Sequence, residues 1–125
     1  MVTVHRLRIA VRAAKEYLDG TKSLKEVKPA LKEAVQAARD AEEEPAAQAA
    51  ARAVSTACTV PHSPTGALGF TFYGAAAYAY SSAGLNEKQK LYEELAETEL
   101  KKILESLQKA AVPDEKNPVK INWNC

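Results

Sequence analysis

The sequence predicts an all-α fold: a single-domain bundle of about five helices around a central uncharged helix, with an extended C-terminal arm. Apolar residues recur at helical spacing in five segments, these segments are bounded by residues typical of helix caps, and only short turns separate them. We expect helices near residues 2–19, 23–42, 45–59, 66–84 and 87–111. The helical domain would span residues 1–111, and residues 112–125 would form an arm docked on the same domain.

The predicted central helix lies in a stretch without charge. Residues 53–86 contain none of the chain's 17 lysines and arginines and none of its 16 aspartates and glutamates. From Thr65 to Gly84 the residues are almost all small or aromatic, TGALGFTFYGAAAYAYSSAG. Such a helix is apolar nearly all the way round, which is typical of a buried helix. We therefore expect the amphipathic segments on either side to surround it.

The first two segments each carry one apolar stripe. In the first, the stripe consists of Leu7, Val11, Ala14 and Leu18, and Gly20 follows as a C-cap. The second begins with Ser23 and Glu26, the pair that forms a capping box. Pro29 then leaves two alternatives: either a helix from Ser23 kinks there, or residues 23–28 form a separate turn and the main helix begins at Pro29.

The remaining segments have clear starts and stops. Glu44 and Pro45 mark the start of a third, alanine-dense helix. Proline is favoured at the first helical position, and the Glu44 carboxylate complements the positive end of the helix dipole. Pro61 and Pro64 make the following loop stiff. The last helix has a buried face that we expect to contain Tyr92, Leu95, Ala96, Leu100, Ile103, Leu107 and Ala111. In the arm, Val119, Ile121 and Trp123 alternate as in an extended strand, and we expect Trp123 to be buried in a groove between helices.

Composition and charge exclude several classes of protein. With 46% hydrophobic and 26% charged residues, the 125-residue chain is an ordinary globular domain. A net charge of +1 argues against a dedicated nucleic-acid binder. The uncharged stretch is too weakly hydrophobic for a membrane span, and no signal peptide is apparent. Two cysteines without a secretory signal then suggest reduced thiols in the cytoplasm.

Positive charge is nevertheless concentrated near the N-terminus. Residues 1–32 carry eight lysines and arginines against three acidic residues, a local excess of 8 − 3 = +5. One interpretation is a basic surface for an acidic partner, and the other is an ordinary solvated helix face.

The sequence contains no convincing catalytic set, cofactor motif or metal-ligand spacing. His62, between Pro61 and Pro64, is four residues after Cys58, so the two could form a nucleophile pair beside a pocket. The alternative is that Cys58 is a core residue and His62 a loop residue. Together with Tyr73 and Trp123, these are the candidate partner or pocket residues.

One part of the chain resembles a known family. The family pattern has the form AARAxxxAxxxxxxHALGxxxY. Its counterparts in this chain are Ala50-Ala51-Arg52-Ala53-Val54, Thr56-Ala57, His62, Ala67-Leu68-Gly69 and Tyr73. From about residue 8 to residue 80 the chain resembles the immunity-five-like immunity proteins of bacterial polymorphic toxin systems. Four residues, Ser63 to Gly66, separate His62 from Ala-Leu-Gly here, whereas in the family pattern the histidine directly precedes that tripeptide.

The resemblance implies a bacterial protein that neutralises a toxin by protein–protein contact, without enzymatic chemistry or a cofactor. The contact surface would be the basic face of residues 6–32 or the rim around His62. Two alternatives stay open: a small helical enzyme or ligand-binding protein with a pocket near Cys58 and His62, and a homodimer or adaptor joined through an alanine-rich face.

Overall fold

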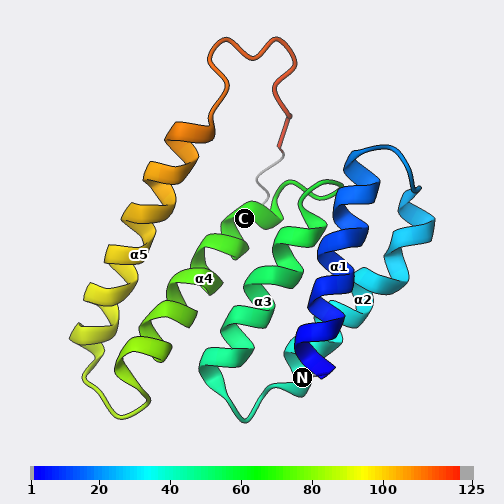
Figure 1. Ribbon diagram of the computed structural model, residues 1–125. Coiled ribbons are helices and arrows are strands. Elements are labelled where there is room, and N and C mark those ends of the chain that lie inside the picture. The colour runs from blue at the N-terminus through cyan, green and yellow to red at the C-terminus, as the bar shows by residue number, and fades with distance from the viewer. Residues whose placement is uncertain (1, 122–125) are drawn as a thin grey trace.

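The computed structural model describes residues 2–121 and contains five helices (Figure 1). They are α1 (Val2–Leu18), α2 (Leu24–Asp40), α3 (Pro45–Thr59), α4 (Gly66–Ala83) and α5 (Gln89–Ala110), and the described residues include no strand. The predicted all-α class and the five helices are confirmed, with ends that differ from the prediction by at most two residues. None of the helices in this range is long and apolar enough to cross a membrane.

Local signals fix the start of α2. The Glu26 amide donates to the Ser23 hydroxyl at 3.3 Å, and the Ser23 amide donates to the Glu26 carboxylate at 2.7 Å. This is the predicted capping box, and the bond from the Ser23 amide is the main cause that holds the pKa of Glu26 below its ordinary value. α2 then continues through Pro29, so the alternative in which the helix begins at Pro29 is wrong.

The main hydrophobic core lies among α1, α2 and α3. Its buried members are Ala10, Ala13, Ala14, Val27, Leu31, Ala34 and Cys58. Most of them are small, and Val27 is the largest fully buried side chain. Alanine at these positions lets the three helix backbones approach closely, so this core depends on close approach more than on bulky side chains.

The prediction that the uncharged helix is central is wrong. Among the five described helices, α3 contacts α1, α2 and α4, whereas α4 contacts only α3 and α5, and α5 contacts only α4 (Figure 1). In α4 only Ala75 and Ala79 are buried, while Phe72 is 62% exposed. The expectation of a buried face on the last helix is also wrong, because none of the residues of α5 is buried and Leu107 is 56% exposed. The hydrophobicity of α4 indicates that it favours burial but does not say which helices cover it. The alanine-dense α3 takes the central place because its short side chains allow neighbours on several sides.

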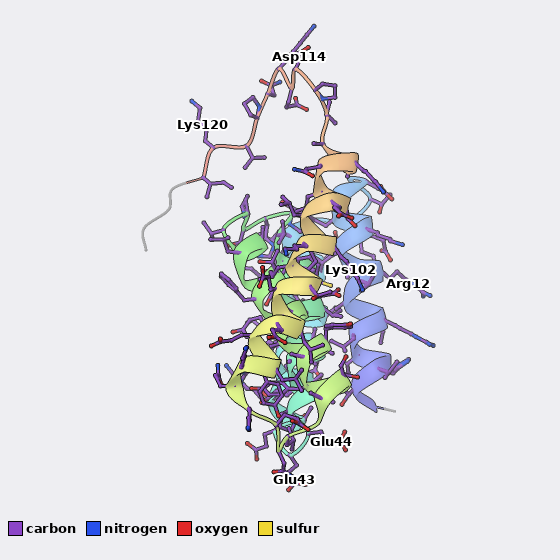
Figure 2. The ribbon with its side chains drawn as sticks, turned by 90° about the vertical axis from the view of Figure 1, so that its left-hand side faces the viewer. Arg12, Glu43, Glu44, Lys102, Asp114 and Lys120 are labelled. Carbon is purple, nitrogen blue, oxygen red and sulfur yellow. The ribbon has the colours of Figure 1, made fainter. Side chains whose placement is uncertain are left out.

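Beyond α5 the chain forms an arm without helix or strand over residues 111–121. The arm arches away from the C-terminal end of α5 (Figure 1), and Asp114 and Lys120 project from it (Figure 2). Val119 is 67% exposed, so the expectation that it covers apolar surface is wrong. Trp123 lies outside the described residues, and docking of the arm through it stays a prediction.

Candidate functional site

An open groove runs along α2 beside the end of α3 and the loop that follows. We call it the basic groove; its lining residues are Lys28, Leu31, Lys32, Val35, Gln36, Arg39, Thr59 and His62. Its volume is about 430 Å³. Six of these residues come from α2, and Thr59 and His62 close the groove from the other side.

Helical spacing explains why α2 presents this surface. Lys28, Lys32 and Gln36 are four residues apart and therefore lie on one face of the helix, with Arg39 one turn further on. Leu31 lies between this face and the core, where it is only 5% exposed. One helix thus supplies both the cationic side chains of the groove and part of its apolar floor.

The cations of the groove are not paired with carboxylates of the described residues. Lys28, Lys32 and Arg39 are exposed, and within residues 2–121 none of them has a carboxylate within 4.0 Å. No aspartate or glutamate is among the lining side chains. Because no carboxylate of residues 2–121 neutralises these charges, they remain available to an acidic ligand or partner.

Other cations of the predicted basic face are already neutralised. The Arg6 guanidinium reaches Asp40 at 2.9 Å and Glu33 at 3.8 Å, and its side chain is only 17% exposed. The Gln36 amide, at 2.8 Å, and Arg6 both donate to the Asp40 carboxylate, and they hold its pKa below the ordinary value. Arg6 therefore ties α1 to α2 and is not free for a partner.

His62 is held at the groove by two contacts. Its backbone amide donates to the Thr59 carbonyl at 3.1 Å, and its ring meets the Tyr17 ring edge-on, with centroids 6.3 Å apart. The sequence offered the basic face of residues 6–32 and the rim around His62 as separate contact surfaces. The structure brings Lys28 and Lys32 together with His62 in one groove.

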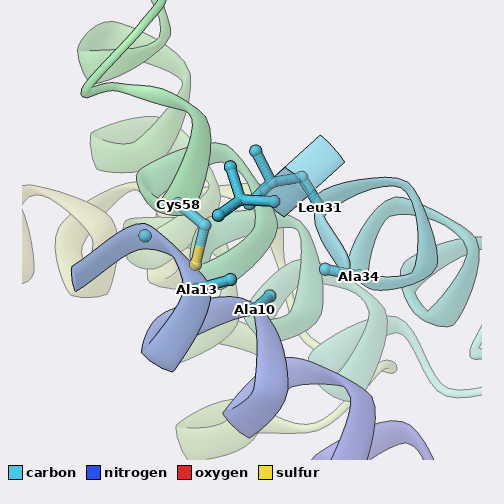
Figure 3. Close-up of a cluster of buried hydrophobic side chains, with 7 residues drawn as sticks. Ala10, Ala13, Leu31, Ala34 and Cys58 are labelled. Carbon is cyan, nitrogen blue, oxygen red and sulfur yellow. The ribbon is translucent and has the colours of Figure 1, made fainter. Parts of the chain in front are cut away.

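Cys58 takes no part in this groove. Its thiol is 5% exposed and lies in the core beside Ala13 and Leu31 (Figure 3). Burial raises the pKa of the Cys58 thiol, whereas a nucleophilic cysteine needs a lowered pKa. The geometry therefore favours the interpretation of Cys58 as a core residue over a Cys58–His62 nucleophile pair.

The other candidate residues lie elsewhere. The Tyr73 ring packs under the guanidinium of Arg52, whose Cζ atom is 5.8 Å from the ring centroid, and this pair joins α4 to α3 away from the basic groove. Trp123 is outside the described residues. The part of the chain that the structure describes holds no cluster of three or more metal-ligating side chains.

Sequence reasoning missed Arg39 and Gln36 as members of the site. The available signal was the spacing of Lys28, Lys32, Gln36 and Arg39 on one side of a predicted helix. What the sequence could not supply is the position of the 60–65 loop, which brings His62 to that side.

Comparison with known proteins agrees with the resemblance. A family model described as Imm-5 like putative immunity protein matches residues 3–118, nearly the whole chain. No curated protein and no solved structure matches. The chain therefore belongs to the Imm-5 like putative immunity protein family.

Proposed function

We propose that this protein neutralises a cognate bacterial toxin by protein–protein contact and that the basic groove is the surface that meets the toxin. The observation that carries the proposal is the family match over residues 3–118. The groove supports the choice of surface, because it combines an apolar floor with cations that pair with no carboxylate of residues 2–121.

The groove suits a partner segment that combines acidic and apolar side chains. Lys28, Lys32 and Arg39 would pair with carboxylates, while Leu31 and Val35 would receive an apolar side chain. Charges of this kind increase the rate of encounter and fix the register of binding. Partly exposed ion pairs contribute up to about 1 kcal/mol each. Three such pairs would therefore account for roughly a tenfold to hundredfold gain in affinity.

The test is co-expression with the product of the neighbouring gene, the candidate toxin, followed by a binding measurement on purified proteins. The test variant reverses Lys28, Lys32 and Arg39 to glutamate. The control variant reverses Arg8, Arg12 and Lys15, three exposed cations of α1, of which Arg12 is seen projecting from the helix in Figure 2. Each triple reversal changes the formal charge by 3 × (−2) = −6, from +1 to −5, so the two variants have the same net charge but carry the change on different surfaces.

We expect the wild type and the control to rescue growth and the groove variant to fail. In the binding measurement, the groove variant should lose affinity by about tenfold or more, and the wild-type affinity should fall as salt is raised. Equal loss in both triple variants would show that only net charge matters and would remove the groove from the proposal. Absence of both rescue and binding for the wild type would overturn the immunity function itself.

A further inference from the structure

α4 has more apolar surface than its neighbours in the fold cover. Residues 66–83 contain no charged side chain, and a helix that is apolar all round is normally buried. Of the helices that the structure describes, α4 contacts only α3 and α5, and two of its own residues are buried. α5 is also poorly covered by the rest of the fold, because none of its residues is buried. Within residues 2–121, part of the apolar surface of these two helices is therefore left uncovered.

This surface forms a groove between α4 and α5, which we call the apolar groove. Its volume is about 450 Å³. The floor includes Ala75 and Ala79, each 3% exposed, and the margin carries Phe72, Tyr80 and Leu85, which are 62%, 37% and 59% exposed. The same face thus offers large protruding side chains and a recess with a small-residue floor. A two-fold interface needs this combination, because the protruding side chains of one copy must meet a recess on the same face of the other.

Charge supports the same occupant. Of the eleven residues that line the apolar groove, only Glu93 is charged. Two copies of a nearly neutral face can meet without the repulsion that opposes self-association of a charged face. The basic groove is different, because two copies of it would bring like charges together.

We propose that the apolar groove is a homodimer interface in which Phe72 of each copy packs against the alanine floor of the other. The interface lies at the α4–α5 end of the molecule, and α2 lies at the other end (Figure 1). The two grooves share no lining residue, so dimerisation leaves the basic groove free. This inference is independent of the proposed function, since it concerns the protein alone.

Analytical ultracentrifugation of the purified full chain tests the proposal. The wild type should sediment as a dimer of about 27 kDa, twice the chain mass of 13.5 kDa, with a melting temperature that rises with protein concentration. Phe72→Glu should raise the dimer dissociation constant by at least about tenfold, because it places a charge in the apolar contact. Leu18→Glu is the matched control, because Leu18 is 67% exposed on α1, and it should leave the dimer unchanged.

Circular dichroism establishes that each variant is folded before its mass is interpreted. If Phe72→Glu does not fold, Leu85→Lys at the turn after α4 takes its place, since Leu85 is also largely exposed in one copy. A wild type that stays monomeric at its highest soluble concentration overturns the proposal. A dimer that resists substitution in the apolar groove, or one that Leu18→Glu dissociates equally well, also overturns this assignment of the interface.

Discussion

Two glycines of α4 allow a matched test of how closely α3 and α4 pack. A β-carbon added at Gly69 would lie 3.3 Å from the Thr56 methyl carbon of α3, whereas one added at Gly74 would lie 3.9 Å from the Ile103 methyl carbon of α5. Neither glycine has a positive φ, so alanine is compatible with both backbones. The two substitutions are chemically identical and differ only in the helix that they approach.

The two distances predict different changes in the free energy of unfolding for the two substitutions. Replacing glycine by alanine inside a helix stabilises it by about 0.5–1 kcal/mol. At Gly74 the new methyl makes an ordinary contact, so we expect the full gain and a melting temperature higher by roughly 3–5 °C. At Gly69 the Thr56 methyl must move, and β-branched threonine is stiff at χ1. Overpacking of this kind costs about 1–3 kcal/mol, so Gly69→Ala should be neutral or destabilising.

Urea unfolding followed by far-UV circular dichroism, at one protein concentration for all samples, measures both variants against the wild type. The reasoning requires that Gly74→Ala be more stable than Gly69→Ala by about 1 kcal/mol or more. Equal stabilisation by the two substitutions would mean that α3 and α4 are not packed as closely as the Gly69–Thr56 distance indicates.

Three further predictions concern the core, the charges and the arm. In a Cys125→Ser background, the Cys58 thiol should react with a thiol reagent only as fast as the protein unfolds, because the thiol is buried and its pKa is raised. Rapid labelling of the folded protein would contradict this prediction. The pKa of Asp40 is lower in the folded than in the unfolded protein, so this carboxylate stabilises the fold above the unfolded pKa near 3.8 and stops doing so as pH falls through the folded pKa. Asp40→Asn should therefore lower the free energy of unfolding at pH 7 and make that free energy fall less steeply in acid, as urea unfolding across pH would measure. If Trp123 docks on the domain, removing residues 121–125 should lower the free energy of unfolding by several kcal/mol. Val119→Ala should leave it unchanged, because the Val119 side chain is exposed. An unchanged melting temperature after the truncation would rule out a docked arm.

The existence of the five helices could be predicted because their signals are local. The Ser23–Glu26 capping box and Pro45 at the start of α3 act within a few residues of the chain, and both appear in the structure at the predicted positions. For Cys58 the sequence left two alternatives open, and the structure favours the one in which it is a core residue. The inward faces were predicted less well: in the stripe expected for α1, Ala14 is buried but Val11 and Leu18 are exposed, and no residue of the face expected for α5 is buried.

The arrangement of the helices could not be predicted in the same way. α4 has no polar face, so periodicity gives no direction for its neighbours, and its strong hydrophobicity suggested a central place that α3 in fact takes. Likewise, the pairing of Arg6 with Asp40 joins residues 34 positions apart, and nothing in the local sequence distinguishes Arg6 from the free cations of the basic groove. Which charges remain available to a partner is a property of the packed helices.

The two proposed surfaces lead to a prediction about stoichiometry. The basic groove and the apolar groove have no residue in common, and α2 contacts neither α4 nor α5. A dimer through the apolar groove would therefore carry two free basic grooves and bind two toxin molecules. Phe72→Glu should convert this assembly to one copy of each protein with an unchanged affinity for the toxin, because each basic groove belongs to a single copy. Multi-angle light scattering of the two complexes measures their masses, and loss of toxin binding by the folded variant would show that the two surfaces are not independent.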